Sequence, residues 1–162
     1  MTVKGKKTLV LGIGNTILTD EGVGIHVIEY LKNSYPENEN VSFIDGGTLS
    51  FSLAGLIAEH QQLIVVDAAR MGAEPGHVAC YEGCAMDRYL TGNRQSVHEV
   101  GLTDLLDIAR LSEHYPENRA LIGIEPANME WGEKPTSLVA KAIPQAAQIV
   151  IEMIDKWSAA SD

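Results

Sequence analysis

Residues 9–31, LVLGIGNTILTDEGVGIHVIEYL, decide the fold of this chain because they join a strand to a helix through a glycine-rich turn. Residues 9–13 are almost all apolar, which is typical of a strand buried on both faces. After the turn, apolar side chains recur at the spacing of one buried helical stripe. That stripe consists of Val23, Val27, Tyr30 and Leu31. Asp20 and Glu21 therefore lie where a central strand passes into a helix, at the sheet edge where open α/β folds bind ligands.

A glycine-rich turn between a strand and a helix first suggests a dinucleotide-binding module. The fingerprint G-x-G-x-x-G needs a third glycine and a helix N-terminus that holds the pyrophosphate. Gly12 and Gly14 match the first two positions, but Ile17 takes the third. Asp20 and Glu21 stand where the phosphates would approach, so we disfavour this function.

The composition restricts the class of protein. The chain has 162 residues, 45% of them hydrophobic, and we expect residues 1–162 to form one domain. Its 22 acidic and 12 basic residues give a net charge of −10, which argues against nucleic-acid and anionic-membrane partners. The basic N-terminus lacks the apolar core and cleavage site of a signal peptide, and no segment approaches transmembrane length. We therefore expect a soluble, cytoplasmic protein.

The two cysteines are too few for a disulfide framework. Cys80 and Cys84 form a C-x-x-x-C pattern, which is neither a redox C-x-x-C motif nor a zinc knuckle. With His77 upstream, a soft metal site is one interpretation, but such cysteines are more often plain thiols in a reducing cytosol. Neither cysteine is placed next to a histidine that would serve as its base.

The next part of the chain continues the alternation of strands and helices. Residues 41–45 and 63–66 read as the second and third strands. Between them, apolar residues from 49 to 57 predict a helix, with Thr48 or Ser50 as its N-cap. This alternation predicts parallel pairing with right-handed crossovers.

The pattern changes after the third strand. The linker AARMGAEPG at residues 68–76 is too short for a parallel return, so residues 77–82 should form an antiparallel strand, polar enough for an edge. Residues 83–99 show little apolar periodicity and read as a long loop. Loops of this length are uncommon in compact domains unless they have a function.

The C-terminal part contains two further helical segments and one strand. Residues 102–109 predict a helix, and residues 120–124, ALIGI, predict a strand apolar enough to be central. A polar loop at residues 127–134 follows. Pro135 opens a last helical region that Pro144 must kink or split.

Four residues could form a site at the carboxyl edge of this sheet. If the strands order 2-1-3, Glu21, Asp45 and Asp67 lie along one edge, and His98 is in the long loop that could fold over it. Carboxylates plus an imidazole suit nickel, zinc or manganese. Each residue has an ordinary alternative, since Asp67 could cap a turn, Glu21 could complement a helix dipole, and Asp45 could form a turn. No G-x-S-x-G or H-E-x-x-H motif is present, so hydrolysis would depend on a metal and carboxylates.

Several blocks of sequence resemble the hydrogenase maturation endopeptidases. The stretch G-x-G-N-x-L-x-x-D-E-G-x-G of that family is matched by GIGNTILTDEGVG at residues 12–24, with Ile17 in the leucine position. The other blocks follow in the order of the family and are Asp45-Gly46-Gly47-Thr48, Val65-Val66-Asp67-Ala68, SVHEVGL at 96–102, and Ile122-Gly123-Ile124-Glu125-Pro126. One departure is that Pro126 follows Glu125, where relatives often have Pro-Glu, so the role of Glu125 is open.

The resemblance implies a function, a metal and a fold. Such proteins remove a C-terminal extension from the large-subunit precursor of a nickel–iron hydrogenase after nickel insertion. The metal-contacting positions of the family fall on Glu21, Asp67 and His98, and the implied nickel is carried by the cysteine-lined site of the substrate rather than held as a resident cofactor. The implied fold is a three-layer α/β/α sandwich with a five-stranded, mostly parallel sheet of order 2-1-3-5-4 and an antiparallel fourth strand.

The catalytic step is less determined by these motifs. Asp45 is the remaining carboxylate and the candidate general base or positioning group, although it could also only form the turn. We expect Gly46 and Gly47 to contact the substrate. A nickel-dependent docking or chaperone protein with the same three ligands and no peptidase activity is the alternative.

Overall fold

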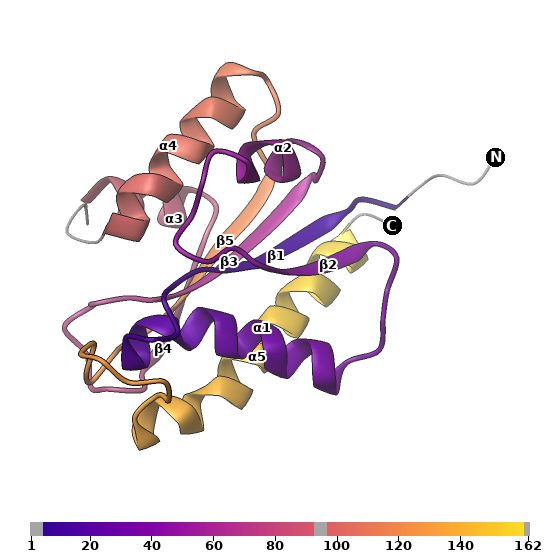
Figure 1. Ribbon diagram of the computed structural model, residues 1–162. Coiled ribbons are helices and arrows are strands. Elements are labelled where there is room, and N and C mark those ends of the chain that lie inside the picture. The colour runs from indigo at the N-terminus through magenta and orange to yellow at the C-terminus, as the bar shows by residue number, and fades with distance from the viewer. Residues whose placement is uncertain (1–4, 93–96, 161–162) are drawn as a thin grey trace.

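The computed structural model describes the backbone of residues 5–92 and 97–160 and the side chains of residues 5–92 and 101–160. It contains a five-stranded sheet of order β2-β1-β3-β5-β4 (Figure 1). The strands are β1 (Thr8–Gly12), β2 (Val41–Asp45), β3 (Gln62–Ala68), β4 (Val78–Glu82) and β5 (Asn118–Ile124). All neighbours pair in parallel except β4 and β5. The predicted sheet order and the antiparallel fourth strand are confirmed.

Helices cover both faces of the sheet, which confirms the three-layer sandwich (Figure 1). The helices α1 (Val23–Ser34) and α5 (Ser137–Ala160) lie on one face. The other face carries α2 (Leu53–Ala58), α3 (Cys84–Gly92) and α4 (Val97–Leu111). Because successive side chains of a strand point to opposite faces, Val10 of β1 packs under α1 and α5, whereas Leu9 and Leu11 pack under the other three helices. Burial on both faces explains the continuous apolar run of the first strand.

The first helix differs from its predicted stripe at one position. Val23, Val27 and Leu31 are fully buried as expected, but Tyr30 is 37% exposed. Ile28 is fully buried instead. The centre of the buried face lies closer to Ile28 than the predicted stripe placed it. Tyr30 therefore lies at the border of that face.

The predicted long loop at residues 83–99 is wrong, because α3 and the start of α4 occupy most of it. Only Met86 and Leu90 of α3 are buried, one turn apart, and this is too few for a clear apolar period. A contact distant in sequence supports the helix: Asp87 accepts hydrogen bonds from Arg119 Nε at 2.9 Å and Arg119 Nη2 at 2.6 Å. The hydroxyl of Tyr115 donates to the same carboxylate at 2.7 Å.

The second helix begins later than predicted. Leu49 has a φ of 71°, a left-handed conformation that a helix does not continue through. The helix α2 therefore starts at Leu53, with Ser52 at the N-cap position and no side-chain cap bond. Thr48 and Ser50 do not cap it, so that prediction is wrong.

The last helix is not split by Pro144, which lies inside α5. In the described part of the chain, α5 is long and apolar enough to cross a membrane by length and composition alone, so the expectation that no segment approaches that length is wrong. Its apolar side chains, from Val139 to Trp157, instead pack against α1 and the sheet. The helix is therefore accounted for as a core element.

Candidate functional site

The second glycine of the turn brings together the backbone segments that carry two of the candidate acids. Gly14 has a φ of 142°, and a Cβ there would overlap the carbonyl oxygen of Glu21. Its amide donates to the carbonyl of Gly47 at 2.8 Å. Glu21 lies in the single 3-10 turn η1 (Thr19–Gly22), and Gly47 belongs to the turn after β2. Only glycine fits between these two segments, so Gly14 sets the separation between Glu21 and the turn that carries Asp45.

The fourth glycine brings the start of α1 against the end of β3. A Cβ at Gly24 would overlap the carbonyl oxygen of Val66, and that same oxygen accepts a hydrogen bond from the amide of Ile13 at 3.0 Å. Asp67 directly follows Val66, and Glu21 lies just before the first turn of α1. The close approach at Gly24 therefore places Glu21 and Asp67 at the same edge of the sheet.

The two carboxylates differ in their surroundings. Asp67 is buried within β3, opposite Gly123 of β5, whereas Glu21 is partly exposed. One oxygen of each, Asp67 Oδ1 and Glu21 Oε2, is fully buried. Two carboxylates on segments that meet at one edge of the sheet, each with a buried oxygen, suit a borderline-hard cation. They equally suit the positioning of a proton donor on a substrate.

The histidine of the predicted set falls on a less well-described segment. His98 is the second residue of α4, and this helix starts at the same end of the molecule as α1 (Figure 1). The side chain of His98 lies outside the described residues, so its contact with Glu21 and Asp67 stays a prediction. Among the side chains that the structure describes, no three of His, Cys, Asp and Glu converge as a metal site.

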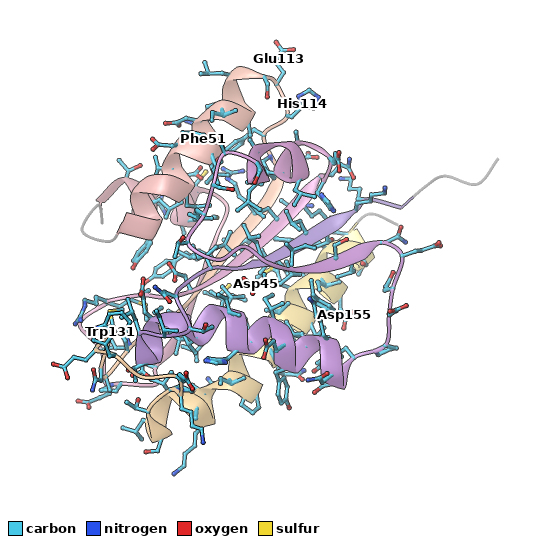
Figure 2. The ribbon with its side chains drawn as sticks, in the orientation of Figure 1. Asp45, Phe51, Glu113, His114, Trp131 and Asp155 are labelled. Atoms are coloured by element: carbon cyan, nitrogen blue, oxygen red, sulfur yellow. The ribbon has the colours of Figure 1, made fainter. Side chains whose placement is uncertain are left out.

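Asp45, labelled in Figure 2, is the last residue of β2 and pairs in register with Gly12 at the end of β1, so it lies at the carboxyl edge of the sheet. Its Oδ1 accepts a hydrogen bond from the amide of Gly47 at 2.8 Å, so it does form the turn. The amide of Gly46 donates to the carbonyl of Gly12 at 2.8 Å, which ties the turn to β1. Both glycine amides are therefore engaged within the protein. Gly47 leaves an open surface, because no atom lies within 4 Å of the place where its Cβ would be.

Sequence reasoning missed the role of Asp20. This carboxylate is fully buried and accepts four hydrogen bonds from the loop between β5 and α5. The donors are the amides of Ala127 at 2.9 Å, Asn128 at 3.0 Å and Thr136 at 2.7 Å, and the hydroxyl of Thr136 at 2.8 Å. Of the Asp-Glu pair, Asp20 therefore has a structural role, and Glu21 stays the predicted site residue. The only signal in the sequence was the pair itself.

Glu125 also has a structural role. It is buried, and its carboxylate accepts hydrogen bonds from the amide of Met71 at 2.9 Å and the amide of Ala73 at 2.7 Å. These bonds shape the linker between β3 and β4. The role of Glu125, which its place before Pro126 left open, is therefore to cap the turn in this linker.

The cysteines form no disulfide and, within the described residues, no metal cluster with His77. Although Cys80 is exposed, partial desolvation and the neighbouring Glu82 carboxylate raise the pKa of its thiol. The thiol is therefore protonated at neutral pH and is a poor nucleophile.

Comparison with known proteins decides the family. Residues 25–153 match the family model described as HycI, hydrogenase maturation protease. The chain belongs to this family. The matched region includes the positions of Asp45, Asp67 and His98 and begins after Glu21. The resemblance noted in the motifs is confirmed, and membership identifies the chain as a protease of hydrogenase maturation.

Individual relatives agree with this assignment. The chain is 36% identical over 155 residues to the hydrogenase expression/formation protein HupD of Rhizobium leguminosarum bv. viciae, covering 95% of this chain and 77% of HupD. It is 34% identical over 147 residues to the hydrogenase 2 maturation protease of Escherichia coli K12, covering 90% of this chain and 88% of that protein. Its fold matches the solved structure of the hydrogenase maturating endopeptidase HybD from E. coli with a TM-score of 0.88, at 31% identity and 93% coverage of both chains.

Proposed function

We propose that this protein is an endopeptidase that removes the C-terminal extension of a nickel–iron hydrogenase large-subunit precursor after nickel has been inserted. Family membership supports the reaction class. The observation that supports the proposal is the close backbone approach at Gly14 and Gly24, which brings the segments that carry Glu21 and Asp67 to one edge of the sheet. We expect the protein to meet this precursor in the cytoplasm.

In this proposal Glu21, Asp67 and His98 contact the nickel that the precursor carries. The nickel is part of the substrate, and the cysteine thiolates of the precursor complete its coordination. The site itself contains no cysteine, so its hard oxygen donors bind nickel weakly without those thiolates. Metal insertion then controls proteolysis, because only a nickel-loaded precursor presents the metal ion that these residues recognise.

Asp45 is the proposed general base or positioning group for the attacking water. Its bond to the amide of Gly47 fixes the orientation of the carboxylate at the end of β2. A fixed carboxylate can accept a proton from a water molecule that lies against the scissile carbonyl. The substrate chain would pass over Gly47, the open side of this turn.

The decisive experiment compares nickel-loaded and nickel-free precursor as substrates. We expect the loaded form to be cut to its mature length on a denaturing gel, and the empty form to remain intact. Asp67→Ala and Glu21→Ala should abolish cleavage, with circular dichroism as the control for folding. Equal cleavage of both precursors would disprove recognition of the substrate nickel. Nickel-dependent binding by the wild-type protein without cleavage would instead identify a docking or chaperone protein.

A further inference from the structure

The loop between β5 and α5 exposes a tryptophan beside the candidate site. Trp131 is 81% exposed, and Figure 2 shows it at the same end of the molecule as the start of α1. Ile17, in the glycine-rich turn, is 44% exposed. Exposed apolar side chains that stand alone are ordinary, but an aromatic ring offers a partner a large apolar area to bury. We call Trp131 and Ile17 together the tryptophan rim.

Backbone hydrogen bonds join the two members of the tryptophan rim. The amide of Gly132 donates to the carbonyl of Ile17 at 2.9 Å, and the amide of Thr19 donates to the carbonyl of Gly132 at 2.8 Å. Leu18 and Gly132 thus form a short parallel bridge. The tryptophan is therefore attached to the same turn that carries Glu21.

Buried polar contacts fix this loop in place. The four donors of the loop to the Asp20 carboxylate come from both of its ends, at Ala127, Asn128 and Thr136. The hydroxyl of Thr19 adds a hydrogen bond to the carbonyl of Glu130, next to the tryptophan. A loop held at so many points loses little conformational entropy when its exposed side chain is covered, which is the property of a good binding anchor.

We propose that the tryptophan rim is the docking contact for the folded hydrogenase precursor, with the Trp131 ring inserted into an apolar pocket of that protein. The inference rests on the proposed function and adds the residues that place the substrate. Asp20 and Glu21 are consecutive, so the carboxylate that fixes the rim also fixes the start of the site. Docking at Trp131 would therefore set the position of the nickel of the precursor relative to Glu21.

The size of the tryptophan rim favours a substrate over a second copy of this chain. A mostly exposed tryptophan and a half-exposed isoleucine offer roughly 200–300 Å² of apolar surface. A stable interface needs about 800 Å² from each partner. A single anchor of this size suits a partner that is bound, processed and released.

The first test measures steady-state cleavage of the nickel-loaded precursor by Trp131→Ala. We expect the KM to rise about tenfold or more while kcat changes less than twofold, because docking and not chemistry is lost. Leu111→Ala is the matched control, since Leu111 is 85% exposed at the far end of α4 and should leave both constants unchanged. Equal KM values for the two variants would overturn the proposal.

The second test observes the ring directly by 19F NMR of the protein labelled with 5-fluorotryptophan. The chain has two tryptophans, and Trp157 is only 3% exposed with its Nε1 donating to Glu82, so it serves as an internal reference. Unlabelled precursor should shift or broaden the Trp131 resonance and leave that of Trp157 in place. An unmoved Trp131 resonance, or a shift that follows the concentration of this protein alone, would overturn the proposal. In that case the proposed function is judged separately. If Asp67→Ala abolishes cleavage while the Trp131 resonance does not move, docking at Trp131 is wrong and the proposed function stands.

Discussion

Asp20 and Asp87 each attach a distant segment of the chain, but they do so by opposite means. Asp20 is fully buried and accepts its hydrogen bonds from backbone amides and a hydroxyl, all uncharged. Asp87 is partly exposed and binds the guanidinium of Arg119. Asp20 fixes the loop beside the candidate site, and Asp87 fixes α3 on the face of the sheet that also carries α2 and α4. The loop beside the site is therefore held by buried, uncharged hydrogen bonds, whereas α3 is held mainly by an ion pair.

Removal of Asp20 should have the largest effect. Asp20→Ala leaves four donors without their acceptor in a buried position, so we expect the free energy of unfolding to fall by about 3 kcal/mol or more. Urea denaturation measures this loss. Cleavage of the precursor should fall too, even at temperatures where the variant is folded, because Glu21 loses its fixed neighbour. If Asp20→Ala were as stable as the wild type, the four buried hydrogen bonds to Asp20 would not stabilise the fold.

Removal of Asp87 should have a smaller effect. Asp87→Ala deletes hydrogen bonds to Arg119 and Tyr115 that solvent partly screens, so we expect a loss of about 1–2 kcal/mol. The loss should be confined to the region of α3, which amide hydrogen exchange resolves. Precursor cleavage should remain near normal. If instead cleavage is abolished while stability is retained, α3 has a role in the reaction that its position does not suggest.

Acid should weaken the attachment of α3 gradually. The hydrogen bond from Arg119 lowers the pKa of Asp87, with a smaller contribution from Tyr115, and partial burial opposes them. The ionised form is therefore favoured in the folded state, so its stabilisation is complete above the usual aspartate pKa and is lost as the pH falls through the lowered value. The difference in stability between wild type and Asp87→Asn should shrink over this acidic range. If this difference in stability instead grew on acidification, folding would raise the pKa of Asp87 rather than lower it.

Salt should give the smallest and most selective effect. The Asp87–Arg119 pair involves two charges near the surface, and its contribution should decrease by a few tenths of a kcal/mol between low and high ionic strength. The partners of Asp20 carry no charge, so the effect of Asp20→Ala should barely depend on salt. Denaturation of both variants at two salt concentrations tests this. Equal salt dependence would remove the distinction between the two carboxylates.

The strands were predictable because they depend on local pattern, whereas the full strand order was implied by the family resemblance. Residues 9–13 and 120–124 are apolar on both faces, and the short linker before residue 77 excludes a parallel return. The helix α3 was not predictable, because its charged anchor Arg119 is 32 residues away from Asp87. The late start of α2 depends on the left-handed backbone of Leu49, for which the sequence gives no signal.

The candidate site was predictable only in part. Glu21, Asp45 and Asp67 follow from the ends of three strands, which the sheet order brings together. Which acid of the pair at Asp20 and Glu21 points into the protein depends on a loop more than a hundred residues away, so pattern alone does not decide it. His98 stays a prediction, since its side chain lies outside the described residues.

The position of β5 has a consequence for the synthesis of the protein. This strand is made late, yet it lies between β3 and β4, which leave the ribosome earlier. Until β5 emerges, β4 has no strand beside it, and the face under α5 remains uncovered until the last helix is complete. Non-local pairing of this kind delays folding and exposes apolar surface in the nascent chain. Truncated products that end before residue 118 should therefore be aggregation-prone and depend on chaperones.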